Sequence, residues 1–169
     1  MKCRCLVPGF ALLLTSVGGM AEVPASEIPI ELDPQDASLV IRPAKDLQVE
    51  KIADGGLRIT YKNEDLKTYR RVVLEKKFNP PVQATAVGFA LIVAAQEEVR
   101  ITGKDTDGVL GSETIKGVAA DSAVVTLDQF RTPGGKTLNG TLQEISISIP
   151  MLAQPDSTSI EIRHWFLQR

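Results

Sequence analysis

The only tryptophan of the chain, Trp165, lies in a segment whose residue types could bind a sugar. If residues 159–167 form a β-strand, Glu161, Arg163 and Trp165 share one of its faces. An indole ring can stack on the apolar C–H face of a sugar, while arginine and glutamate side chains hydrogen-bond its hydroxyl groups. The pattern predicts a sugar-binding platform, provided that the opposite face packs into a core. Two alternatives stay open: Trp165 packs beneath a loop, or the strand register slips after Ile162.

Basic side chains at alternate positions of two earlier segments could extend this platform. The residues are Arg58, Lys62, Arg71 and Lys77, of which Arg58 and Arg71 are the stronger ligand-binding candidates. On strands these positions could form a cationic stripe along one sheet face. The alternative is that they are ordinary solvated positions, which is the commoner use of outward-facing basic residues.

Three acidic residues could share a cation. Asp105 and Asp107 lie in the sequence Asp-Thr-Asp-Gly, and Asp121 follows further along the chain. Calcium prefers six to eight oxygen ligands, and this loop could supply two carboxylates and a carbonyl. A structural calcium ion at Asp105 and Asp107 is therefore a candidate, and no other cofactor is expected. The EF-hand signature is not met, however, and this sequence is also a common turn.

His164 is the only histidine, so a metal site with two histidine ligands is impossible, and a serine-histidine-aspartate triad would have to use this ring. It lies on the strand face opposite Trp165, together with Ile160, Ile162 and Phe166. A lone histidine among apolar residues is more often a hydrogen-bonded core residue. We therefore expect His164 to be buried.

The first 21 residues have the pattern of a secretory signal peptide. Lys2 and Arg4 precede a mainly apolar run, and small residues precede a cleavage position after Ala21. An uncleaved amphipathic anchor is the alternative. Both cysteines, Cys3 and Cys5, precede the apolar run, whereas a lipoprotein carries its modified cysteine after it. We therefore expect a secreted or periplasmic protein without a membrane span after cleavage.

Cleavage after residue 21 of the 169-residue chain would leave 148 residues without cysteine. That portion can form neither a disulfide nor a thiolate site, so its stability must come from a hydrophobic core. It would carry 17 Lys and Arg residues against 21 Asp and Glu residues. This acidic balance does not favour nucleic acid or an anionic membrane as a partner. Residues 22–36 are proline-rich and are expected to form an extended arm, and residues 37–169 one domain.

Short segments of alternating polarity, separated by turn residues, run through residues 37–169. Residues 57–62 and 144–149 show the alternation most clearly. We count about nine such segments and no convincing amphipathic helix. This pattern predicts an all-β protein, an antiparallel β-sandwich of the jelly-roll type.

The longest apolar run after the leader, residues 86–95, is predicted to be a strand at the middle of the sandwich. It contains Gly88 and several β-branched residues, which favour a pleated strand. A buried helix over residues 82–99 is the alternative, because a short apolar run does not fix the period. We expect the run and the alternating segment that ends at Gly108 to be neighbouring strands.

The order of these segments resembles the galactose-binding-like jelly rolls, which include many carbohydrate-binding modules of bacterial glycoside hydrolases. The resemblance rests on an apolar strand, VGFALIV, followed by an acidic loop, Asp105 to Gly108, and then by the segment VTLDQF at residues 125–130. An isoleucine-rich strand at residues 145–149 and a closing strand at residues 159–162 complete the order. Family members often carry a calcium-binding aspartate where this chain has Arg163, so the resemblance does not extend to that calcium site.

The resemblance implies an exported, non-catalytic domain that binds a polysaccharide. A structural or interaction module that docks an envelope protein is the alternative, which the small number of aromatic residues favours. An enzyme is a third possibility, since two suitably spaced carboxylates can hydrolyse a glycosidic bond. No recognisable catalytic signature contains such a pair in this sequence.

Overall fold

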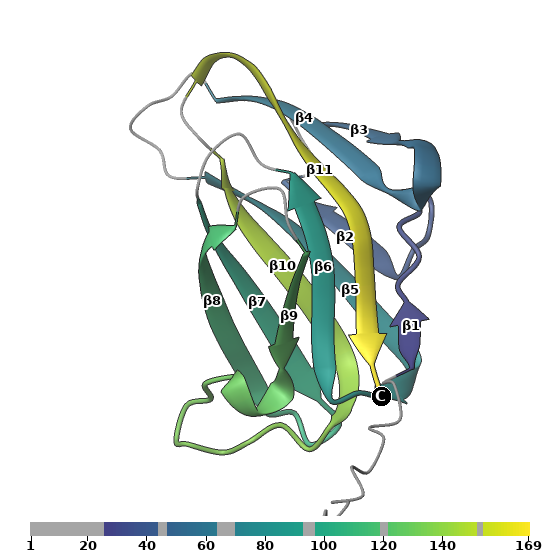
Figure 1. Ribbon diagram of the computed structural model, residues 1–169, viewed down its shortest axis with the longest axis vertical. Coiled ribbons are helices and arrows are strands. Elements are labelled where there is room, and N and C mark those ends of the chain that lie inside the picture. Colours follow the sequence, from purple (N-terminus) through teal and green to yellow (C-terminus); the bar gives the residue numbers. More distant parts are fainter. Residues whose placement is uncertain (1–25, 44–46, 64–69, 93–96, 119–121, 152–153) are drawn as a thin grey trace, which may run out of the picture.

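Alternating apolar side chains produce a sandwich of two antiparallel sheets in the computed structural model (Figure 1). The structure describes residues 26–43, 47–63, 70–92, 97–118, 122–151 and 154–169. These residues form eleven strands: β1 (Glu27–Pro29), β2 (Leu39–Arg42), β3 (Leu47–Lys51), β4 (Leu57–Asn63), β5 (Arg70–Gln83), β6 (Ala86–Ile92), β7 (Glu97–Asp105), β8 (Leu110–Val118), β9 (Ser122–Thr126), β10 (Thr141–Met151) and β11 (Gln154–Gln168). The predicted all-β antiparallel sandwich is confirmed.

The two sheets interleave strands that are distant in sequence. Sheet A has the order β3-β4-β11-β6-β9. β4 pairs with the first part of β11, and β1 pairs with the last residues of β11 along the same edge. Sheet B has the order β2-β5-β10-β7-β8. The last two strands, β10 and β11, therefore lie at the centres of opposite sheets. Two short 3-10 turns, Ala53–Gly55 and Leu127–Gln129, are the helical elements of the described residues, and neither could span a membrane.

The apolar run that follows residue 85 forms β6, as predicted, and the helical alternative is wrong. Its inward residues Val87, Phe89 and Leu91 are fully buried. The expectation that β6 and β7 are neighbours is wrong, because β6 lies in sheet A and β7 in sheet B. The sequence between them thus carries the chain from one layer of the sandwich to the other.

A β-bulge in β11 reverses the direction in which its side chains point. The register with β6 shifts between Ile162 and His164, which are paired with Leu91 and Ala90. Before the bulge, Ile160 and Ile162 point into the core; after it, Trp165 and Leu167 do. Arg163 and His164 are consequently both exposed. An extra residue in one strand has this effect because successive side chains point to opposite faces.

The bulge also places Phe166 on the outer face of sheet A. Phe166 and its pairing partner Gly88 are both buried there, outside the main core cluster. A Cβ atom added to Gly88 would lie 2.1 Å from Cζ of Phe166, so the ring lies directly over the glycine. On the solvent side the ring meets His164, with the two ring centroids 4.8 Å apart. His164 Nε2 is 3.5 Å from a carboxylate oxygen of Glu27 in β1.

Asp105, at the end of β7, is a buried carboxylate that organises two loops. One oxygen accepts hydrogen bonds from the backbone N–H groups of Asp107 and Val109, at 3.0 and 2.8 Å. The other accepts the backbone N–H of Asn139, at 3.0 Å. The side-chain amide of Asn139 in turn donates to Thr106 and Asp107. The carboxylate therefore joins the turn after β7 to the loop before β10.

Replacing Gly88 by alanine should destabilise the protein, because its methyl group and the Phe166 ring would occupy the same space. Overpacking of this kind costs about 1–3 kcal/mol. The measurement is thermal or urea unfolding of Gly88→Ala, Phe166→Leu and the double variant. The double variant should lose less stability than the sum of the single changes; strict additivity would contradict the contact.

Replacing Asp105 by asparagine should destabilise the protein by about 1–3 kcal/mol, because an amide nitrogen cannot accept the backbone N–H groups that the carboxylate now satisfies. Asp107→Asn is the matched control, since Asp107 is exposed and, among the described residues, its carboxylate accepts a hydrogen bond only from the side-chain amide of Asn139. Urea unfolding should separate the two variants. Equal stability of the two would contradict the anchoring role.

Candidate functional site

The predicted sugar platform around Trp165 is wrong. Trp165 is 1% exposed and lies in the core, so its ring cannot stack on a ligand at the surface. The alternative of a register slip after Ile162 is confirmed by the bulge. The same bulge contradicts the expected burial of His164, whose side chain is 51% exposed.

Glu161, Arg163 and Arg58 do come together on the outer face of sheet A, but they bind one another. Arg58 donates from Nε and Nη2 to one oxygen of Glu161, at 3.0 and 2.9 Å. Arg163 donates to the other oxygen, at 3.2 and 3.1 Å. Nη1 of Arg58 is 2.8 Å from Glu50. Both Glu161 oxygens are thus engaged by guanidinium groups.

The charges of this cluster stabilise one another's ionised forms. Hydrogen bonds from Arg58 and then Arg163 lower the pKa of Glu161. Hydrogen bonds to Glu50 and then Glu161 raise the pKa of Arg58. A ligand at this position would have to compete with these existing ion pairs. The cluster is therefore better explained as part of sheet A than as a binding site.

Arg71 lies on the opposite side of the molecule. It belongs to β5 of sheet B and donates to the hydroxyl and carbonyl oxygens of Ser148 and to the Glu98 carbonyl. The predicted stripe on one sheet face is therefore wrong for Arg58, in sheet A, and for Arg71 and Lys77, in sheet B. The side chain of Lys62 lies outside the described residues. The structure thus divides the predicted sugar site between two faces.

The predicted calcium candidates form a turn whose geometry is explained by hydrogen bonds. Asp105 is fully buried and its two oxygens accept three backbone N–H groups, whereas Asp107 is exposed. Asp121 lies outside the described residues. Among the residues that the structure describes, no three His, Cys, Asp or Glu side chains gather as a metal site would require. The plain-turn alternative explains every contact of Asp105.

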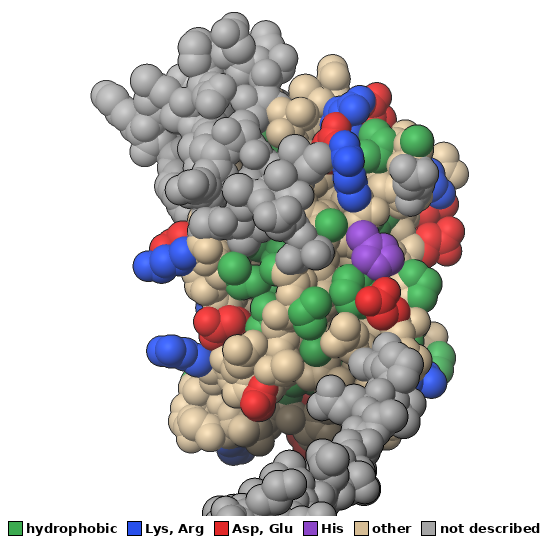
Figure 2. Space-filling model, viewed as in Figure 1, with side chains coloured by type: hydrophobic (Ala, Val, Ile, Leu, Met, Phe, Trp, Pro, Cys, Tyr) green, Lys and Arg blue, Asp and Glu red, His purple; other side chains and the backbone are tan. Residues whose placement is uncertain are grey.

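The aromatic side chains of the described residues do not form an exposed stacking surface. Tyr61, Phe89, Phe130, Trp165 and Phe166 are all buried, and Phe78 is half-buried against the core. The view onto sheet A in Figure 2 shows hydrophobic side chains between charged ones on this face. The large apolar residues most exposed among those described are aliphatic, Leu110 and Val124. A ligand of the described surface would therefore have to bind without stacking on an exposed Phe, Tyr or Trp ring.

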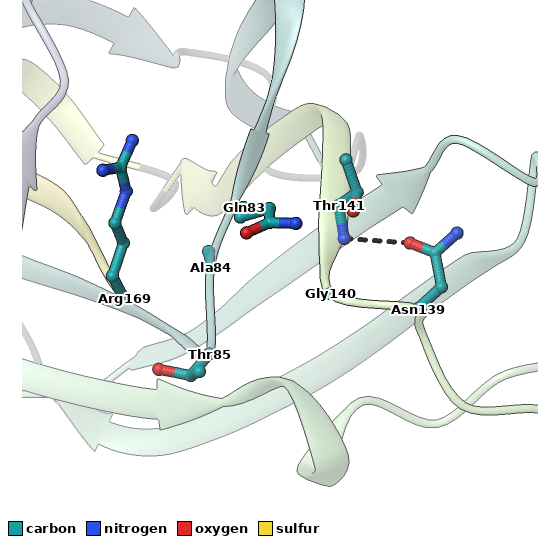
Figure 3. A pocket seen from close by; sticks show the side chains of 7 residues that line it. All are labelled: Gln83, Ala84, Thr85, Asn139, Gly140, Thr141 and Arg169. Carbon is teal, nitrogen blue, oxygen red and sulfur yellow. Dashed lines mark hydrogen bonds between the residues drawn. The ribbon is translucent and has the colours of Figure 1, made fainter.

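A polar hollow of 270 Å³ lies at one end of the sandwich, between the start of β6 and the start of β10 (Figure 3). Its polar side chains are Gln83, Thr85, Asn139, Thr141 and Arg169. The Asn139 side chain already makes hydrogen bonds within the protein. Its oxygen accepts the Thr141 backbone N–H at 2.9 Å, and its amide donates to Thr106 and Asp107. The hollow could hold a small polar group, but much of its hydrogen-bonding capacity is used internally.

The outer face of sheet B carries a regular array of polar side chains. Cross-strand pairing aligns Ser146, Thr102 and Ser112 in one row on β10, β7 and β8. Ser148, Arg100 and Thr114 form the next row on the same three strands. We call these six residues the hydroxyl array. Its members stand on the paired strands β10 and β7 and on the edge strand β8, so the backbone pairing fixes their positions before any ligand binds.

The hydroxyl array was missed from the sequence, although a signal for it was present. Polar residues alternate with apolar or small ones at residues 100–104 (RITGK), and Ser112, Thr114 and Lys116 stand at alternate positions of the later segment. This spacing puts Arg100, Thr102 and Lys104 on one face of β7. What the sequence did not show is that β7 pairs with β10 on one side and with β8 on the other.

Comparison with known proteins supports the fold. No protein-family model matches the chain, and neither does any curated protein sequence. Among solved structures, the agarase AgWH50C matches with a TM-score of 0.53 and 11% identity over 84% of this chain and 24% of its own. This chain thus spans about a quarter of that enzyme's length.

Two isolated modules match over almost their whole length. The family 11 carbohydrate-binding module of cellulosomal cellulase Lic26A-Cel5E of Clostridium thermocellum has a TM-score of 0.50 and 13% identity, covering 87% of this chain and 97% of that one. The structure described as BiXyn10A CBM1 in its apo form has a TM-score of 0.54 and 8% identity, covering 85% and 96%. The chain described here therefore has a β-sandwich fold like that of carbohydrate-binding modules.

Proposed function

We propose that this chain is an exported, non-catalytic domain that binds a polysaccharide across the outer face of sheet B. The observation that carries the proposal is the hydroxyl array, in which two rows of Ser, Thr and Arg side chains cross three adjacent strands. Sugar hydroxyl groups both donate and accept hydrogen bonds, and so do serine and threonine hydroxyls. An array with this chemistry can follow successive units of a glycan chain.

Binding on this face depends on several hydrogen bonds rather than on a stacked ring. Each bond exchanges a water contact for a protein contact, so its net contribution is only about 0.5–1.5 kcal/mol. A single sugar unit would gain little from the array. We therefore propose an extended glycan as ligand, because a chain can engage both rows at once.

The carboxylates near the array support a binding rather than a hydrolytic role. Glu75 is 3.3 Å from Arg42 and 3.4 Å from Lys77, and Glu98 is 3.3 Å from Lys116. Both carboxylates already serve as ion-pair partners, which leaves the Ser, Thr and Arg side chains of the array as the groups available to a ligand. Export is proposed from the signal-peptide pattern of residues 1–21.

Replacing Thr102 by valine should weaken polysaccharide binding about fivefold, because it removes one hydrogen bond of about 1 kcal/mol without changing the shape of the side chain. The assay is affinity electrophoresis of the full chain in gels containing neutral polymers (agarose, mixed-linkage glucan, xylan) and acidic ones. Thr60→Val is the matched control, because Thr60 is likewise half-buried on a central strand, but on sheet A.

Retardation of the native chain by at least one polymer, reduced by Thr102→Val but not by Thr60→Val, is the expected result. Arg169→Gln tests the hollow of Figure 3 in the same gels and should leave retardation unchanged. If no polymer retards the native chain, the proposed function is wrong. If Thr60→Val or Arg169→Gln has the larger effect, the ligand lies elsewhere on the molecule.

A further inference from the structure

A hollow of 310 Å³ lies at the edge of the hydroxyl array, beside β8. Two basic side chains, Arg100 and Arg131, line it together with the hydroxyl-bearing Ser112 and Thr132 and the apolar Leu110 and Pro133. We call it the arginine hollow. None of its residues belongs to the sites predicted from the sequence.

The fold brings the two arginines together from segments that are about 30 residues apart in sequence. Arg131 follows the second 3-10 turn, and its backbone forms an isolated bridge with Ser112, with N···O distances of 2.9 and 3.0 Å. This bridge extends sheet B by one position and puts Arg131 on the same face as Ser112. Arg100 approaches from β7, where its Nη2 donates to Ser112 Oγ at 3.0 Å. Ser112 is thus bonded to Arg131 through its backbone and to Arg100 through its hydroxyl.

The positive charge of the arginine hollow is not neutralised by neighbouring carboxylates. Among the described residues, the Arg131 side chain has no ion pair or hydrogen bond, and Arg100 donates only to the neutral Ser112 hydroxyl. The acids Glu75 and Glu98 of this face are paired with Arg42, Lys77 and Lys116. This arrangement contrasts with sheet A, where Arg58 and Arg163 are matched by Glu50 and Glu161.

The outer face of sheet B as a whole also carries an excess of positive charge. Of its described side chains, seven are basic and three are acidic: Arg42, Arg71, Lys77, Arg100, Lys104, Lys116 and Arg131 against Glu75, Glu98 and Glu144. The full chain has a formal net charge of −2, so basic residues are concentrated on this side. A face of this kind attracts an anionic ligand and orients it.

We propose that the arginine hollow binds the acidic group of a sugar unit, a carboxylate or a sulfate ester, within the glycan on the hydroxyl array. This inference rests on the proposed function and makes the ligand an acidic polysaccharide. Guanidinium groups bind carboxylate and sulfate oxygens with paired, charge-assisted hydrogen bonds. The Ser112 hydroxyl accepts from Arg100 and keeps its own proton to donate. Leu110, 50% exposed, and Pro133 offer apolar contact to the C–H groups of the same sugar unit.

The test compares polymers that differ mainly in their charge. Polygalacturonate is compared with highly methyl-esterified pectin, in which the carboxylate is blocked, and carrageenan with chemically desulfated carrageenan. We expect the native full chain to bind at least one acidic polymer about tenfold more tightly than its neutral counterpart in affinity electrophoresis. The two pairs distinguish a carboxylate from a sulfate ester as the group that is bound.

Substitutions then locate the acidic group. Arg131→Gln and Arg100→Gln should each reduce affinity for the acidic polymer about tenfold, to the level of its neutral counterpart, because each removes a charge-assisted hydrogen-bond donor. Lys77→Gln removes one charge from the same face outside the hollow and should have a much smaller effect. Arg131→Lys keeps the positive charge but loses the planar guanidinium group. Its affinity for the acidic polymer should lie between those of the native chain and of Arg131→Gln. Unchanged melting temperatures show that the variants are folded.

Three results would overturn the inference. One is equal binding of the acidic and neutral members of both pairs, which would leave the proposed function intact and assign a neutral glycan. Another is an equal loss from Lys77→Gln and Arg131→Gln, which would indicate diffuse attraction of any polyanion, nucleic acid included. The third is the absence of retardation by any of the four polymers; the proposed function is wrong as well only if agarose, mixed-linkage glucan and xylan also fail to retard the native chain.

Discussion

The structure depends on one extra residue in the middle of β11. This strand pairs with β4 along its first half and with β1 along its last residues, while β6 runs along its other edge. Strict alternation after Ile162 would put His164 and Phe166 into the core and Trp165 into solvent. The bulge instead buries the largest side chain of the chain among the aliphatic rows of both sheets. The outer face of sheet A, with Phe166 over Gly88 and with Arg163 and His164 exposed, follows from this bulge.

The two outer faces differ in how their polar groups are used. On sheet A the guanidinium groups and carboxylates satisfy one another, and Phe166 closes the space over Gly88. On sheet B the hydroxyl array stands on paired strands and Arg131 in a loop that is bridged to β8, and these side chains have fewer internal partners. Groups that are fixed in position but not yet satisfied gain more from a ligand than groups that must first break an ion pair. This difference is the physical basis for assigning the ligand to sheet B.

Much of the architecture could be predicted from the sequence, because the alternation of apolar residues has the period of a strand and sets which side chains face inward. Residues 57–62 and 144–149 are clear examples, and so is the turn at Asp105. The pairing between strands could not be predicted in this way. The sequence around Arg58 and Arg71 contains no signal that these residues belong to opposite sheets. The bulge at Ile162 has no compositional signal either, and it reversed the prediction for Trp165 and His164. The position of Arg131 could not be predicted either. Arg131 lies in a loop, and only its bridge to Ser112 places it on the outer face of sheet B.

The central positions of β10 and β11 have a consequence for how the chain can assemble. β4 and β6 do not pair with each other but are both held by β11, and the contact between Arg58 and Glu161 spans 103 residues of sequence. Closing loops of this length is entropically unfavourable until the strand that unites them is in place. Sheet A is therefore completed late, and such non-local pairing makes folding slow. As the chain is synthesised from its N-terminus, β4 and β6 therefore emerge before the strand that unites them, and the native order of sheet A can form only once the C-terminal residues are available.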